Sequence, residues 1–133
     1  MVAALVISGL IVSISGLFGQ GRSMQPANIV LPPVTFATST GKRAFDAYCS
    51  DCHGNNAAGS AQGPPLLHDY YNPGHHPDAS FQHAVRQGVK QHHWQFGDMP
   101  AQPQVTEAQV AAIIQYIREL QKANSIVYRV HRM

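Results

Sequence analysis

The sequence predicts an all-α protein with one compact domain. The strongest indication is an apolar stripe of helical period between residues 106 and 124, which begins with a capping box. A shorter helix is predicted to begin at Asp78 or Ser80 and to end at Gly88. The chain lacks the alternation of strands and helices that an α/β protein requires. With 133 residues, it is long enough for one hydrophobic core.

An uncharged apolar run from Val2 to Phe18 stands at the N-terminus. Its length lies at the lower limit of the roughly 17–25 residues that span a bilayer, and slightly above the apolar core of a secretory signal. Residues 1–20 are therefore predicted to be a signal peptide or an N-terminal membrane anchor. We expect export to the periplasmic side, where the protein is soluble or held at the inner membrane through residues 2–18.

Residues 21–40 are predicted to be a linker, because three prolines stand there among small and polar residues without an apolar period. Thr40 is the predicted cap of a short helix over residues 41–48. Within this helix, Phe45 and Tyr48 supply apolar contacts on the side that leads into the next motif.

The most informative motif is Cys49-Ser50-Asp51-Cys52-His53, which has the C-x-x-C-H pattern of covalent haem attachment. Two thiols at this spacing can each bond one vinyl group of a single porphyrin, and the next residue is then carried beneath the iron. We predict one covalently bound haem c, held by Cys49 and Cys52, with His53 as an iron ligand. A thioredoxin-like redox pair would need α/β surroundings, and a zinc site would need a second closely spaced ligand pair. Both alternatives fit the sequence less well.

A low-spin electron carrier needs a second axial ligand, and a methionine in that position raises the reduction potential of the iron. Met99 is the predicted ligand, because Gly97 and Pro100 fix the chain around it. Met24 lies in the predicted linker, and Met133 is the last residue. The alternatives are that Met99 fills a gap in the core and that a histidine binds the iron.

Four further histidines stand in two pairs. His75 and His76 lie in a loop with proline and glycine, and His92 and His93 come directly before Trp94. Solvated loop positions are the simplest interpretation of both pairs. One of His92, His93 and Trp94 could instead donate a hydrogen bond to a haem propionate. A paired-histidine site for copper or zinc is a further alternative.

Taken in order, these motifs resemble those of the class I (monohaem) cytochrome c family over roughly residues 41–124. The similar segments are the first helix, the haem-attachment motif, the Gly63-Pro64-Pro65-Leu66 turn, the Met99-Pro100-Ala101 loop and the C-terminal helix. The resemblance implies a cytochrome c domain over residues 41–124, in which helices wrap one covalently bound haem. It also implies that the Pro64 carbonyl accepts a hydrogen bond from His53, and it leaves residues 125–133 as a C-terminal tail.

The function that this resemblance implies is electron transfer, with single electrons shuttled through His/Met-ligated iron and no enzymatic reaction. Redox proteins would be the donor and the acceptor, and a membrane segment would also suit a subunit of a larger respiratory complex. The rival is an enzyme or gas sensor in which the iron keeps an open position and Met99 is unbound. The net charge of +2 comes from scattered residues, so nucleic acid is not an expected partner. Three lysines, Lys42, Lys90 and Lys122, are too few to indicate strong electrostatic docking.

Overall fold

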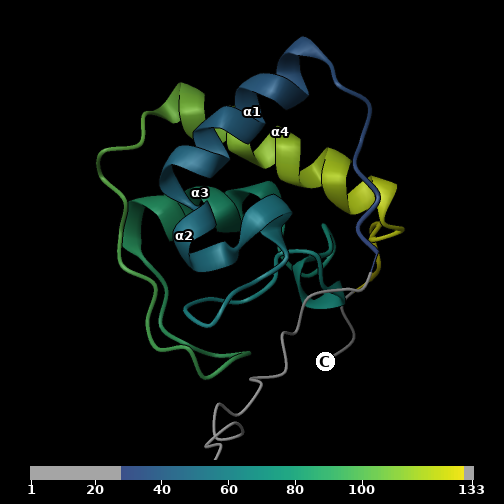
Figure 1. The fold of residues 1–133 in the computed structure, drawn as a ribbon. Helices are drawn as coiled ribbons and strands as arrows, with labels where there is room; N and C mark the ends of the chain where they lie inside the picture. The colour runs from purple at the N-terminus through teal and green to yellow at the C-terminus, as the bar shows by residue number, and fades with distance from the viewer. Residues whose placement is uncertain (1–27, 131–133) are drawn as a thin grey trace, which may run out of the picture.

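The computed structural model describes residues 28–130, and the predicted signal peptide or anchor lies outside this part. Within it the chain forms four α-helices and two short 3-10 turns (Figure 1). The helices are α1 (Phe36–Tyr48), α2 (Ser50–His53), α3 (Asp78–Gln87) and α4 (Glu107–Ala123), and the turns are Asn55–Ala57 and Asp69–Tyr71. Residues 28–130 contain no strand beyond an isolated antiparallel bridge between Val89 and Met99. The all-α prediction is therefore confirmed.

Among these described helices, none has the length and apolar character needed to span a bilayer.

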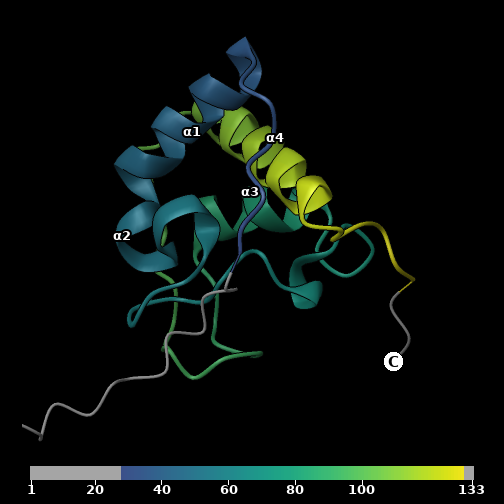
Figure 2. The same ribbon diagram turned by 45° about the vertical axis from the view of Figure 1, so that its right-hand side comes forward.

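Helices α1 and α4 cross and form the centre of the fold (Figures 1 and 2). Phe45 of α1 is fully buried, and its ring centroid lies 5.8 Å from that of Tyr116 in α4. The predicted stripe of α4 faces the same core, and its five members are at most 5% exposed: Val110, Ile113, Ile114, Ile117 and Leu120. Burying each such side chain contributes about 1.5–3 kcal/mol, so this crossing supplies much of the stability of the domain.

A glycine allows the two helices to approach closely. A Cβ atom at Gly41 would lie 2.1 Å from the carbonyl oxygen of Ala112 and 2.6 Å from the Cβ of Tyr116. The first of these neighbours is backbone and cannot rotate away. The absence of a side chain at Gly41 therefore sets the separation of α1 and α4 at this point.

We expect Gly41→Ala to destabilise the protein, because the added methyl group must push two helix backbones apart, which costs about 3 kcal/mol or more at a contact this short. The gain in helix propensity, about 1 kcal/mol, offsets only part of this loss. Thermal unfolding of the pigmented protein, followed by circular dichroism, measures the effect. Ala47→Gly, at an exposed site of the same helix, is the control for propensity alone. An unchanged or higher Tm for Gly41→Ala would contradict the close approach.

Helix α1 begins five residues earlier than predicted, at Phe36 instead of Gly41, so the expected cap at Thr40 is wrong. The cap is Thr35, whose side chain accepts a hydrogen bond from the Thr38 N–H (3.1 Å), while Thr38 Oγ1 accepts one from the Thr35 N–H (2.7 Å). This is a capping box with threonine in the position where glutamate or glutamine is usual, so the sequence lacks the common signature of a helix start here. Residues 36–40, predicted as linker, are helical.

The helix α4 has the predicted capping box, with Thr106 and Gln109 bonded reciprocally. Its C-terminal end is fastened to the segment before α1. The Asn124 side-chain amide donates to the Val30 carbonyl (2.8 Å), and its oxygen accepts from the Val30 N–H (2.9 Å). Ile29 and Ile126, which stand close to this pair in the sequence, also pack against the core. Residues 28–35 therefore lie against the domain.

Helix α3 ends at Gly88 as predicted, but neither predicted cap is used. Asp78 is the first helical residue, and Pro77 precedes it without a side-chain cap. The Asp78 carboxylate instead accepts a hydrogen bond from Arg118 Nε of α4 at 2.7 Å. The Arg118 guanidinium also donates to the backbone carbonyls of Tyr71 (2.9 Å) and His76 (2.5 Å). One largely buried arginine thus ties the loop before α3 to α4.

Candidate functional site

Helix α2 is a single turn that carries Cys52 and His53, and Cys49 stands at its N-cap. Cys49 closes α1 through its N–H, which donates to the Phe45 carbonyl (2.8 Å), and its own carbonyl accepts from the His53 N–H (2.9 Å). Cys52 is exposed, whereas Cys49 is partly buried. Burial, with a smaller contribution from Cys52, raises the pKa of Cys49 to about 11. The junction of two helices therefore fixes the spacing of the two thiols.

The loop after His53 folds back onto α2. The Gly59 N–H donates to the His53 carbonyl (2.6 Å), and the Ser60 hydroxyl donates to the Cys52 carbonyl (2.6 Å). These contacts return the chain to α2 and place the Pro64 carbonyl beside the imidazole ring of His53.

The imidazole of His53 is oriented by a single backbone contact. Its Nδ1 lies 2.9 Å from the Pro64 carbonyl oxygen, which can only accept, so Nδ1 carries the proton. The other nitrogen, Nε2, is left with its lone pair. Burial lowers the pKa of His53, and the hydrogen bond to Pro64 opposes this shift in part. A neutral, oriented imidazole is the form that binds a metal ion.

A cavity of about 520 Å³ adjoins this ring. Four of the five predicted site residues line it: Cys49, His53, Pro64 and Met99. Cys52 is not among the lining residues and faces solvent. The remaining wall is mainly apolar and comes from α1, α3, α4 and the loop after α3, with Phe45, Phe81, Val85, Ile113, Ile114 and Ile117 among its members. Its volume lies within the roughly 300–1,000 Å³ of small-molecule pockets.

Met99 is held at this cavity by its backbone. Its N–H and carbonyl each pair with Val89 at 2.9 Å, which closes the base of the loop between the two residues. Gly88 precedes Val89 with φ +75°, and a Cβ there would lie 2.5 Å from the Met99 carbonyl oxygen. An exposed ion pair, Lys90–Asp98 at 2.5 Å, crosses the same loop. These contacts fix the backbone position of Met99 beside the cavity.

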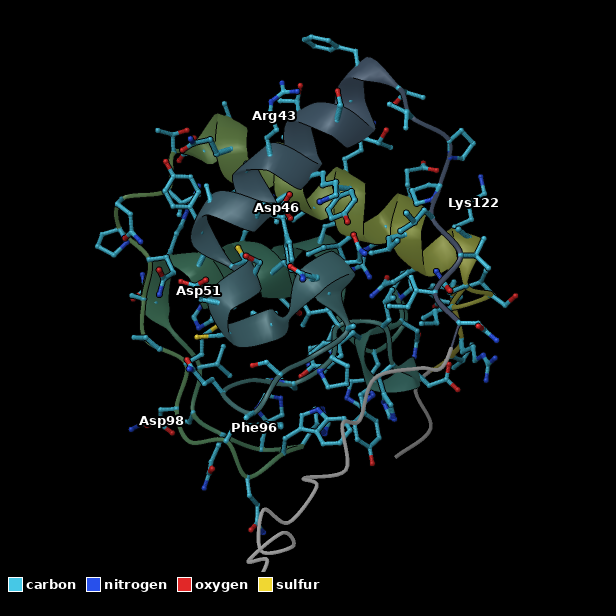
Figure 3. All side chains as sticks on the ribbon, in the orientation of Figure 1. Arg43, Asp46, Asp51, Phe96, Asp98 and Lys122 are labelled. Carbon is cyan, nitrogen blue, oxygen red and sulfur yellow. The ribbon has the colours of Figure 1, made fainter. Side chains whose placement is uncertain are left out.

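The residues labelled in Figure 3 show where charged side chains lie on the surface near this site. Asp46 lies on the exposed side of α1, and Asp51 lies on the exposed side of α2. Phe96 and Asp98 lie in the loop after α3, and Lys122 lies at the far end of α4 (Figure 3). The exposed side of α1 and α2 therefore carries charges of both signs, with Asp46 paired to Lys42, and no cluster of lysines.

A buried donor indicates what the cavity can hold. Trp94 lines it, and the indole Nε1 makes no hydrogen bond of normal geometry within residues 28–130. It lies near enough to the Tyr71 hydroxyl to lower the pKa of that group, but burial dominates and raises the Tyr71 pKa to about 12. A buried donor without an acceptor costs about 1–3 kcal/mol. An apolar cavity lined by the Cys49 thiol, a neutral imidazole, a thioether and an indole N–H, with the Cys52 thiol exposed on the same helical turn as His53, fits a haem with its acidic propionates.

The two histidine pairs meet beside this cavity. His76, His92 and His93 are among its lining residues, and the rings of His75 and His76 are stacked with centroids 4.7 Å apart. Burial lowers the pKa of His76, and the positive charges of His75, His92 and Arg118 lower it further, against a hydrogen bond to the Tyr70 carbonyl. His75, His76 and His93 lie in loops, as expected, and are partly buried, whereas His92 is exposed.

Two residues that position the site were not identified from the sequence. Gln121 is 1% exposed, and its amide donates to the carbonyls of Leu66 (2.9 Å) and Tyr71 (3.0 Å). Arg118 accompanies it on α4 and donates to its Oε1 at 2.7 Å. The sequence does contain a signal for Gln121: it stands four residues after Ile117, on the apolar face of the helix, where a polar side chain is expected to be buried and hydrogen-bonded.

The similarity of this chain to known proteins lies at the level of the family. The family model described as cytochrome c matches residues 38–121, which is more than half of the chain. No curated protein and no solved structure matches it. Members of this family generally bind haem covalently and carry electrons. The helical fold and the matched segment, which contains both cysteines, His53 and Met99, lead to one conclusion: the chain belongs to the cytochrome c family.

Proposed function

We propose that this protein is a monohaem electron carrier, with haem c bonded to Cys49 and Cys52 and with iron bound by His53 and Met99. The observation that carries the proposal is that Cys49, His53 and Met99 line one apolar cavity, while the His53 Nδ1 proton is engaged by Pro64. This combination leaves an oriented nitrogen lone pair and a thioether at the same site.

When bound, haem supplies a one-electron couple between ferric and ferrous iron. The two cysteines would fix the porphyrin to α2, so that it cannot be lost to a competing binder. The Pro64 carbonyl would keep the His53 ring in place and increase its electron donation. The apolar wall from α3 and α4 would exclude water and keep the iron environment similar in both oxidation states.

Electron exchange would take place where the haem edge reaches the surface. Because Cys52 is exposed, its thioether would mark that edge. We expect redox proteins as donor and acceptor, and an N-terminal anchor would suit a subunit of a larger respiratory complex. The three lysines are spread along the chain, and Lys42 is paired with Asp46, so we do not expect strong electrostatic steering towards an acidic partner.

The test is the absorption spectrum and intact mass of the full chain, made in an exporting host that can attach haem c. We expect one haem per chain, retained after acid-acetone extraction, and a ferrous form that resists carbon monoxide. Rapid binding of carbon monoxide would support the rival with an open iron position, such as a gas sensor. A colourless mature protein would exclude both. The same mass reports whether residues 1–20 are cleaved as a signal peptide or kept as an anchor.

A further inference from the structure

Three histidines from two loops come together beside the haem cavity. His75 and His76 lie in the loop before α3, and His93 lies in the loop after it. Their candidate ligand nitrogens all lie within 4.8 Å of one another, and all three residues are half-buried. The ring centroid of His93 is 4.9 Å from that of His75 and 5.2 Å from that of His76. Within residues 28–130, these three histidines are the one group of three or more His, Cys, Asp or Glu side chains placed closely enough to hold one metal ion.

The spacing is close to that of a three-imidazole metal site. Two histidine nitrogens at about 2.0–2.1 Å from a tetrahedral metal ion lie about 3.4 Å apart. The observed upper limit of 4.8 Å therefore requires movements of about 1.4 Å or less. Because all three side chains come from loops, small side-chain rotations and loop shifts can supply these movements without disturbing a helix.

A second observation concerns the orientation of one ligand. The Nδ1 of His76 lies 2.5 Å from the Tyr70 carbonyl oxygen, so this nitrogen carries the proton and Nε2 keeps the lone pair. A hydrogen bond of this kind orients almost every metal-binding histidine. The backbone of the same residue is also fixed, because its carbonyl accepts from Arg118, which in turn is paired with Asp78. His76 is thus held from both its ring and its backbone.

We propose that His75, His76 and His93 form a binding site for one divalent first-row transition-metal ion, with a fourth position open to water. Three imidazoles without a thiolate or carboxylate suit copper, zinc and nickel, and Cu²⁺ binds such donors most tightly. Because His76 and His93 line the haem cavity, this second metal would lie next to it. The site does not depend on which residues bind the haem iron, and its failure would leave the proposed electron carrier intact.

The experiment uses the full-length pigmented protein without an affinity tag, in the ferric state, so that the haem cannot reduce the added copper. Copper sulfate is added below one equivalent, and electron paramagnetic resonance reports the nitrogens around Cu²⁺. Zinc sulfate is titrated separately by calorimetry. We expect one ion per chain, with Cu²⁺ coupled to histidine nitrogens. Since loss of a residue that merely supports a metal ligand costs about 10–100-fold in affinity, His75→Gln and His93→Gln should each cost at least about 100-fold.

The matched control is His83→Gln, which removes an exposed histidine of α3 and should change the affinity less than about twofold. The haem spectrum of each variant shows whether the fold and the iron ligands are retained. Equal zinc affinity in wild type and in the His75→Gln, His93→Gln double variant would overturn the proposal. If a variant loses its pigment, the wild-type copper spectrum decides alone, and a signal without histidine coupling overturns the site. A change of iron ligand in His93→Gln would assign that residue to haem and also overturn it.

Discussion

Replacing Cys49 and Cys52 together by alanine should yield a protein without covalently bound haem and with little stable fold. Both thioethers are lost, so any pigment that remains would be extracted by acid-acetone. The structural cost follows from the cavity of about 520 Å³ next to the α1–α4 core. At about 24 cal/mol per Å³, an unfilled cavity of this size costs up to about 12 kcal/mol. This is an upper limit, because part of the wall already faces water, but it equals the whole stability of a typical domain.

The measurement is a haem stain of the denatured protein together with far-ultraviolet circular dichroism. Ser50→Ala is the control, because it changes one of the two residues between the cysteines and removes only a side-chain hydrogen bond to the Asp46 carbonyl. Each single cysteine variant should keep one thioether and an intermediate stability. A double variant that stays fully helical and colourless would show that the fold around the cavity is stable without haem. That result would contradict the structural role proposed for haem.

Met99→Ala should lower the reduction potential by on the order of 0.1 V or more, because the thioether favours ferrous iron. It should also open the iron to carbon monoxide and remove the weak band that a bound methionine gives at the red end of the ferric spectrum. Protein-film voltammetry and the ferrous spectrum under carbon monoxide measure these effects. The backbone pairing of Met99 with Val89 does not involve the side chain, so the loop should stay in place.

Two further variants separate ligation from folding. Met99→His should restore a six-coordinate iron that resists carbon monoxide, while its potential stays low. Gln95→Ala, at an exposed site of the same loop, should leave spectrum and potential unchanged. If Met99→Ala kept the wild-type potential and still resisted carbon monoxide, another side chain, such as one of the nearby histidines, would have to be the second axial ligand.

The elements that the sequence predicted well are those governed by local rules. The stripe and capping box of α4 lie within one helix, and Gly88 ends α3 because a positive φ is tolerated there. The start of α1 was predicted wrongly for a local reason as well, because the capping box at Thr35 uses a less common residue as its reciprocal partner. Such errors arise when a short polar residue can serve either a linker or a helix cap.

The arrangement around the cavity was predicted only in part, because much of it depends on contacts between distant segments. One motif indicated Cys49 and His53 and a distant segment indicated Met99, and tertiary packing brings the side chains to one cavity. No pattern placed His93 beside the first histidine pair, since their approach depends on the path of two loops around α3. The role of Arg118 also depends on three backbone and side-chain acceptors that lie at least 40 positions earlier in the chain.

The attachment of residues 28–35 to the end of α4 affects how a shortened version of this protein should be designed. The motifs suggest a truncation at Gly41, where the family-like segment begins. Such a cut would remove the first helical turn, the Thr35 cap and the pair of hydrogen bonds between Val30 and Asn124. It would also uncover the core surface that Ile29 covers. A minimal recombinant form for spectroscopy or electrode work should therefore keep every residue from position 28 onward.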